Sequence, residues 1–193
     1  MSNDDWATPD YLFRWLTSRF GFVLDAAADD TNHKCPHYYT KEQNGLIMPW
    51  ADDGVTFCNP PYSEVGMWVG CAVHEWIQYE RESVLLCPVR SDQAWWHEFV
   101  LSGICKVEWY KGRIKFSNAP GSAWMYNVNL LFTSPERPVI SSIDINKIYN
   151  NWATEAEKNE RIKLKKARRA RAKSVPNDGA GTGDNGREPF GEG

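Results

Sequence analysis

The residues of this chain whose types and order best suit chemistry are Asn59, Pro60, Pro61 and Tyr62, which follow the β-branched and aromatic run 55–58. The run predicts a buried strand, and the two prolines end it because proline cannot donate to a strand ladder. Asn59 is therefore expected at the carboxyl end of a strand, which is the edge where ligands bind in open α/β sheets.

These four residues suit the binding of a planar ring that carries an amino group. The Asn59 side-chain oxygen and the Pro60 carbonyl can both accept hydrogen bonds from one amine. Two such acceptors favour a tetrahedral nitrogen and localise a lone pair that the ring would otherwise delocalise. Tyr62 offers a face for an extruded base. The alternative is a structural Pro-Pro turn with Tyr62 in the core.

A second candidate ligand site follows the strand expected over 22–24. Asp25 stands at the carboxyl end of that strand, and its carboxylate can bind an amine or a hydroxyl. Ala26, Ala27 and Ala28 come next, and their small side chains let a ligand approach the backbone closely. The alternative is an ordinary strand end with an acidic residue.

The stretch before Asp10 predicts the start of a helix that Gly21 ends. Thr8 is a good N-cap, Pro9 fits the first helical position, and the carboxylate of Asp10 is favourable beside the helix dipole. Taken alone, Thr8 and Pro9 indicate a helix start and no binding site.

Periodicity predicts further elements along the chain. Residues 29–54 are irregular, and 117–126 form the loop best placed to touch a substrate. A hairpin is expected at 110–112. The predicted helices span about 64–81 and the stretch around 95–100, and the predicted strands span 83–87, 104–109, 113–116 and 127–132.

Charge divides the chain into an acidic body and a basic end. Residues 1–157 hold 12 basic and 20 acidic residues, and residues 158–193 hold 10 basic and 5 acidic ones. We expect a catalytic domain over 1–143, one long helix with a basic end over 144–173, and a disordered tail over 174–193. The basic run is either a nucleic-acid patch or a solvated helix end.

Several classes of protein are disfavoured by the sequence. No run of about eighteen apolar residues is present, so no membrane span is expected, and the acidic N-terminus lacks a signal core. A cytoplasmic protein is therefore predicted. Five scattered cysteines suggest buried apolar residues and no disulfide framework. His33, Cys35 and His37 have no second cluster of ligands, so no metal site is predicted.

The order of these stretches resembles the S-adenosylmethionine-dependent DNA adenine methyltransferases, and most closely the small phage-encoded Dam-type enzymes. The resemblance covers roughly residues 6–132. The stretches that carry it are Trp6-Ala7-Thr8-Pro9, Leu24-Asp25-Ala26-Ala27-Ala28, Lys34-Cys35-Pro36, Gly45-Leu46, Cys58-Asn59-Pro60-Pro61-Tyr62 and Gly112-Arg113-Ile114-Lys115-Phe116.

The resemblance implies an α/β fold with a reduced Rossmann-like methyltransferase sheet. It implies that Asn59, Pro60, Pro61 and Tyr62 bind adenine in double-stranded DNA. It also implies a bacterial host cell as the location.

The same resemblance implies that S-adenosylmethionine binds at Thr8, Pro9, Asp25 with Ala26, Ala27 and Ala28, and at Asn59. Only 33 residues separate Asp25 from Asn59, too few for the two βα units that usually intervene there. The acid that binds the cofactor ribose in relatives is therefore unassigned, with Asp29 or Asp30 as substitutes.

Two alternatives stay open at this point. The Asn-Pro-Pro-Tyr motif also suits methylation of an amine on RNA, protein or a small molecule. A DNA-binding protein without catalysis could keep the same fold and act through its basic end. No feature of the sequence assigns an oligomeric state or a DNA recognition sequence.

Overall fold

The computed structural model of the 193-residue chain describes residues 4, 6–119, 121, 123 and 125–173. They fall into two compact units, which within the described residues extend from 4 to 153 and from 154 to 173. The helices are α1 (Asp10–Phe20), α2 (Val65–Tyr79), the π-helical turn η2 (Trp96–Val100), α3 (Ile145–Trp152) and α4 (Glu155–Lys173). The strands are β1 (Phe22–Asp25), β2 (His37–Tyr38), β3 (Val55–Cys58), β4 (Ser83–Pro88), β5 (Lys106–Lys111), β6 (Asn127–Phe132) and β7 (Ser142–Asp144).

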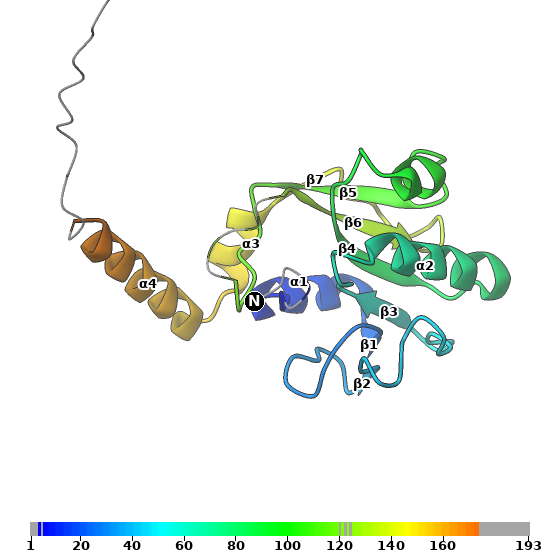
Figure 1. Cartoon of the computed structure of the whole chain (residues 1–193), viewed down its shortest axis with the longest axis horizontal. Coiled ribbons are helices and arrows are strands. Elements are labelled where there is room, and N and C mark those ends of the chain that lie inside the picture. The colour runs from blue at the N-terminus through cyan, green and yellow to red at the C-terminus, as the bar shows by residue number, and fades with distance from the viewer. Residues whose placement is uncertain (1–3, 5, 120, 122, 124, 174–193) are drawn as a thin grey trace, which may run out of the picture. The chain divides into compact units, whose positions relative to one another are not determined.

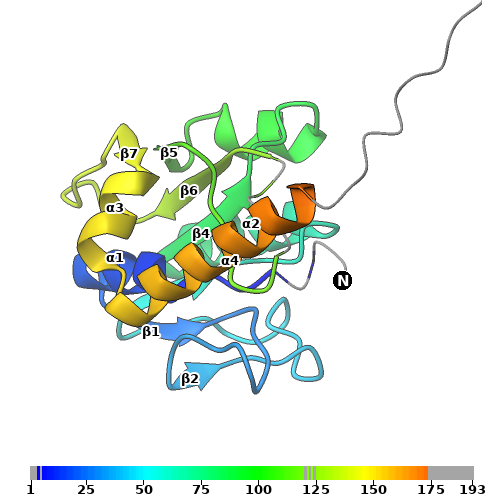
Figure 2. The same ribbon diagram turned by 90° about the vertical axis from the view of Figure 1, so that its left-hand side faces the viewer.

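The first unit is built on one seven-stranded mixed sheet in the order β2-β1-β3-β4-β6-β5-β7. β2, β1, β3 and β4 run parallel, and β6 lies antiparallel between β4 and β5. Figure 2 shows β2 at one edge of this sheet and β7 at the other. This arrangement confirms the expected α/β, Rossmann-like class.

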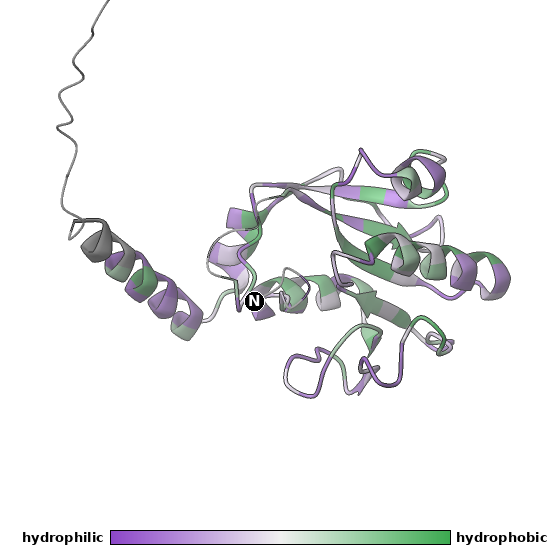
Figure 3. Ribbon diagram, viewed as in Figure 1, coloured by the Kyte–Doolittle hydropathy of each residue, from purple (hydrophilic) through white to green (hydrophobic). Residues whose placement is uncertain are grey.

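Helices cover both faces of the sheet (Figure 1), and its central strands β3, β4 and β6 are accordingly buried along their whole length. Side chains of α1 and α3 join one buried cluster, and side chains of α2 and η2 join the other. In Figure 3 the central strands are accordingly green, whereas the described part of α4 is mainly purple.

The strand predicted over 113–116 and its hairpin are wrong. β5 ends at Lys111 and pairs with β6 and β7 instead. Ile114 and Phe116 are fully buried. The alternation of apolar residues over 113–116 therefore reflects the packing of these two side chains, and the segment does not pair as a strand. The segment turns toward the N-terminus, where the Ser117 amide donates to the Ala7 carbonyl at 3.0 Å.

The single helix predicted over 144–173 is also wrong, because α3 and α4 are separate helices. Thr154 begins the second one with a capping box. Its hydroxyl accepts from the Glu157 amide at 3.2 Å, and the Glu157 carboxylate accepts from the Thr154 amide at 2.6 Å. Ile145 and Ile148 bury α3 in the first unit. The tail predicted over 174–193 lies outside the described residues.

The N-cap predicted at Thr8 is wrong as well. Pro9 occupies the N-cap position of α1, and its carbonyl accepts from the amides of Leu12 and Phe13 at 3.0 Å. The Thr8 hydroxyl is buried and has no hydrogen-bond partner among the described residues. That hydroxyl is therefore available to a ligand.

Candidate adenine and cofactor site

Parallel pairing of β1 with β3 places the two predicted ligand stretches side by side. Asp25 stands opposite Phe57 in the register, and the Ala26 amide continues the pairing by donating to the Phe57 carbonyl at 2.9 Å. Asn59 follows two residues after Phe57. The carboxyl ends of both strands thus meet at the same edge of the sheet, as expected of an open α/β fold.

A cavity of about 640 Å³ lies at this edge, within the size range of small-molecule sites. The sequence-predicted residues Thr8, Asp25, Asn59 and Pro61 line it together with the alanines 26–28. The remaining lining residues are Asp4, Trp6, Ala7, Asp29, Thr31, Asn32, Lys34, Tyr39, Thr40, Lys41, Asn44, Gly45, Leu46, Phe57, Ser63, Glu64, Trp68 and Asn118.

Asn59 is held in one orientation by the N-terminal segment. Its side-chain Nδ2 donates to the Trp6 carbonyl at 2.7 Å. A carbonyl can only accept, so the amide must turn its NH₂ group toward Trp6. The other amide atom, Oδ1, is buried without a hydrogen-bond partner among the described residues. Asn59 therefore offers an unused acceptor, and buried acceptors of this kind are uncommon.

Asp25 carries a second unused acceptor in the same cavity. Its Oδ2 accepts from the Lys34 amide at 3.0 Å, whereas Oδ1 is buried with no partner among the described residues. Burial raises the pKa of Asp25 to about 7, because removal from water disfavours the charged carboxylate. The Oδ1 atom can accept a hydrogen bond from a ligand hydroxyl, and a bound cation would favour the ionised carboxylate.

Tyr62, which the sequence reasoning placed against the base, is not among the residues that line the cavity. The side chain is only 6% exposed, and its hydroxyl accepts from the Asn127 Nδ2 at 2.6 Å. Burial raises the pKa of the Tyr62 hydroxyl. Pro9 and Pro60 are likewise absent from the cavity lining, and contact of Tyr62 with a base stays a prediction.

The structure also shows the surroundings of three other residues considered in the sequence, which are Asp29, Asp30 and Cys58. Asp29 lines the cavity, but its Oδ1 already accepts from the Thr31 amide at 2.7 Å. Asp30 accepts instead from the Tyr38 hydroxyl at 2.9 Å and is no lining residue. Cys58 is fully buried, and burial raises its thiol pKa well above the ordinary value. This thiol is therefore no nucleophile.

The remaining expectations from the sequence concern metal ligands, membrane-spanning helices and the loop 117–126. No three His, Cys, Asp or Glu side chains within the described residues are grouped as metal ligands. His33 uses its ring for a hydrogen bond to the Cys35 carbonyl. The described helices include none that is long and apolar enough to cross a membrane. Of the loop 117–126, only part lies within the described residues, with Asn118 lining the cavity.

Gly45 is a site residue that the sequence reasoning did not assign. A Cβ atom at this position would stand 2.1 Å from the Ala26 carbonyl oxygen and 3.1 Å from the Trp68 ring. Only glycine lets the loop approach the end of β1 so closely. The glycine within the irregular stretch 29–54 was the available signal, since an isolated glycine can mark a close backbone approach.

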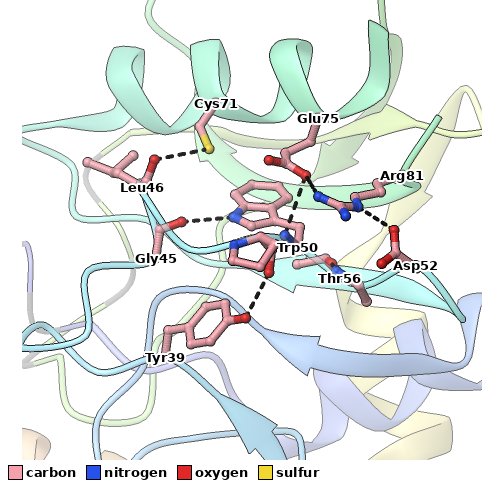
Figure 4. A network of polar contacts seen from close by, with 11 residues as sticks. Tyr39, Gly45, Leu46, Trp50, Asp52, Thr56, Cys71, Glu75 and Arg81 are labelled. Atoms are coloured by element: carbon pink, nitrogen blue, oxygen red, sulfur yellow. Dashed lines mark hydrogen bonds and ion pairs between the residues drawn. The ribbon is translucent and has the colours of Figure 1, made fainter. Parts of the chain in front are cut away.

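A network of polar contacts fixes the loop that carries Gly45 (Figure 4). The Trp50 indole donates to the Gly45 carbonyl at 2.9 Å, and the Trp50 amide donates to Glu75 at 3.4 Å. Glu75 is buried on α2 and forms an ion pair with Arg81 at 2.8 Å. The ion pair with Arg81 offsets part of the cost of burying the Glu75 carboxylate, and the hydrogen bond from the Trp50 amide ties the loop to α2.

Comparison with known proteins gives this arrangement a family. The family model described as "DNA N-6-adenine-methyltransferase (Dam)" matches residues 1–130, which include every residue that lines the cavity. The chain belongs to this family. The match confirms the resemblance that the Asn-Pro-Pro-Tyr, Asp25 and Thr8-Pro9 stretches indicated.

Two phage proteins are similar to the chain. The "DNA N-6-adenine-methyltransferase" of Escherichia phage T1 is 28% identical over 134 residues, which is 69% of this chain and 55% of the relative. A protein of the same name from Haemophilus phage HP1 is 31% identical over 117 residues, covering 60% of this chain and 67% of the relative. The chain thus spans just over half of the phage T1 relative.

We expect Gly45→Ala to destabilise the protein by about 1–3 kcal/mol, because the added methyl group must displace the Ala26 backbone. Gly70→Ala is the matched control. A Cβ there meets only the Phe99 ring at an ordinary 3.7 Å, and alanine favours the helix by about 0.5–1 kcal/mol. Urea unfolding midpoints measure both effects. Equal midpoints for the two variants would contradict the close approach.

Asp25 should make stability depend on pH. Its pKa is about 7 in the folded chain, above the ordinary 3.8, so the folded state binds the proton more tightly. Wild-type stability should therefore fall as pH rises from about 4 to about 7.

Asp25→Asn removes this titration, so its stability relative to the wild type should increase across the same interval. Urea unfolding between pH 4 and pH 8 measures the difference. Asp53→Asn, an exposed site outside the cavity, corrects for the loss of one negative charge. A difference that stays flat with pH would contradict the assignment.

Proposed function

We propose that this chain transfers a methyl group from S-adenosylmethionine to the 6-amino group of adenine in double-stranded DNA. Membership of the Dam family supports the reaction, and two phage relatives carry that activity in their names. One observation carries the proposal: Asn59 lines the cavity with an acceptor, Oδ1, that has no partner among the described residues.

Asn59 provides the hydrogen-bond acceptor that this reaction requires of the protein. The adenine amine is a weak nucleophile because its lone pair is delocalised into the ring. A hydrogen bond from the amine to Asn59 Oδ1 favours a tetrahedral nitrogen. The nitrogen lone pair is then directed at the methyl group to be transferred. Bound S-adenosylmethionine would supply an already activated methyl group: the N–C bond would form as the S–C bond breaks, S-adenosylhomocysteine would leave, and the amine would release one proton to water. The protein's work is therefore positioning and hydrogen bonding. The proposed second acceptor is the carbonyl of Pro60, in the peptide bond that joins it to the lining residue Pro61.

The cavity next to Asn59 fits the cofactor. Thr8 Oγ1 and Asp25 Oδ1 are buried acceptors without partners among the described residues, and both residues line the cavity. These atoms can accept hydrogen bonds from the hydroxyl and ammonium groups of S-adenosylmethionine. Ala26, Ala27 and Ala28 line the cavity, and their small side chains leave room for a ligand beside the end of β1. Asp29 is a further lining acid for the ribose.

Double-stranded DNA is the proposed partner, and α4 offers it a basic surface. Residues 158–173 hold nine basic residues and one acidic residue. Ile162 and Leu164 are exposed, so the described part of this helix buries no apolar face. A helix of this kind attracts phosphates without reading sequence. A location in the bacterial cytoplasm, where DNA lies, stays a prediction.

The decisive experiment is a methyl-transfer assay with labelled S-adenosylmethionine on unmethylated plasmid, with the methylated base identified by mass spectrometry. N6-methyladenine is the expected product. Label that enters only RNA, protein or a small amine would support a different amine methyltransferase. DNA binding without any methyl transfer would leave a non-catalytic DNA-binding protein.

Asn59→Ala should lower the rate of methyl transfer by about 10²–10³ while cofactor binding survives, because the variant loses one acceptor at the reacting centre. Turnover and calorimetric cofactor affinity are measured together. Asn150→Ala removes an exposed amide outside the cavity and should change neither. A fully active Asn59→Ala variant would remove Asn59 from the catalytic site.

Neutralising two cations of α4 should weaken DNA binding and flatten its salt dependence. For Lys165→Gln/Lys166→Gln we expect a log–log slope lower by about 0.9 for each phosphate that the variant no longer neutralises. Glutamine keeps the helix propensity of lysine. The control Lys111→Gln/Lys147→Gln removes the same charge from exposed sites of the first unit. Equal slopes for the two variants would show that α4 does not bind phosphate groups of DNA.

A further inference from the structure

The described residues of the N-terminal segment, Asp4 and 6–8, lie against the loop that carries the Asn-Pro-Pro-Tyr motif. The Ser63 amide and hydroxyl donate to the two Asp4 carboxylate oxygens at 2.9 and 3.0 Å. Asn59 Nδ2 donates to the Trp6 carbonyl at 2.7 Å. The segment therefore contacts the motif loop on both sides of its prolines.

The other side of the same segment is fixed by the loop after Phe116. The Ala7 amide donates to Asn118 Oδ1 at 2.8 Å, and the Ala7 carbonyl accepts from the Ser117 amide at 3.0 Å. Both backbone polar groups of Ala7 are thus used. Trp6, which precedes Ala7, is held in a defined position at the cavity wall.

The Trp6 ring belongs to a cluster of three aromatic side chains. It stacks on Phe116 with centroids 5.4 Å apart and meets Tyr62 edge-on at 5.6 Å. Phe116 and Tyr62 are buried, and neither lines the cavity. Of the three, Trp6 alone is a lining residue. Trp6 therefore brings this aromatic cluster to the wall of the cavity, next to the Asn59 side chain that its own carbonyl holds.

We propose that the Trp6 ring contacts the extruded adenine, while its own carbonyl orients Asn59 for the amine. An extruded base loses its stacking neighbours, and an aromatic side chain restores part of that interaction. One residue then provides the contact for the ring and fixes the acceptor for the amine. This inference rests on the proposed adenine methylation and adds a residue to it.

The test uses the full-length protein with Trp6→Ala and Trp6→Phe, and Trp109→Ala as control. Trp109 is an exposed tryptophan on β5 that does not line the cavity. The readouts are kcat, KM for DNA, melting temperature and the fluorescence of 2-aminopurine at the target position. The Trp6 carbonyl remains in all variants, so the loss of the ring is measured separately from the orientation of Asn59.

We expect Trp6→Ala to lower kcat/KM per folded molecule by about tenfold to a hundredfold. The 2-aminopurine signal should change in parallel, because the extruded base dwells less often in the site. Trp6→Phe should recover a substantial part of both, since it keeps an aromatic face. Trp109→Ala should behave as the wild type in both readouts.

Two results would overturn the inference. The first is a Trp6→Ala variant with wild-type kcat, KM and 2-aminopurine signal. The second is a loss that follows only the folded fraction, because a purely structural tryptophan would act through stability. The wild-type assay separates this inference from the function: no adenine methylation by the wild type removes the proposed function, whereas methylation with an unaffected Trp6→Ala variant removes only Trp6.

Discussion

The parallel register of β1 and β3 is the constraint on which the site depends. Because Asp25 stands opposite Phe57, the polar groups that follow the two strands emerge at one edge of the sheet. A shift of one residue would turn every side chain of a strand to the other face. Both faces of this sheet are buried, so packing on each side holds the register and with it the spacing of Asp25 and Asn59.

Segments distant in sequence then close the cavity around this edge. Gly45 approaches the Ala26 carbonyl from the loop between β2 and β3, and the Trp50–Glu75–Arg81 contacts hold that loop to α2. The N-terminal segment closes the other side through Trp6. The site is therefore formed by the carboxyl ends of β1 and β3, the loop between β2 and β3, and the N-terminal segment together.

The cavity retains buried acceptors that a stable core would normally satisfy. An unpaired buried polar group costs about 1–3 kcal/mol, and Thr8, Asp25 and Asn59 each hold one at the same cavity. By contrast, the buried Glu108 is fully used, since it accepts from Arg19, Asn129 and the Ile140 amide. The concentration of unused acceptors in one place is what a ligand with several donors would relieve.

The sequence by itself determined the α/β class, most of the central strands and the placement of Asn59 and Asp25 at strand ends. These follow from local rules, since proline ends a strand and apolar runs form buried ones. Only the tertiary structure decided that Tyr62 is buried, that Thr8 leaves its hydroxyl uncapped, and that Trp6 orients Asn59. Each of these depends on a contact between segments more than fifty residues apart or on competition for one backbone group. No local pattern encodes such contacts, because many arrangements of the same elements satisfy the same periodicity.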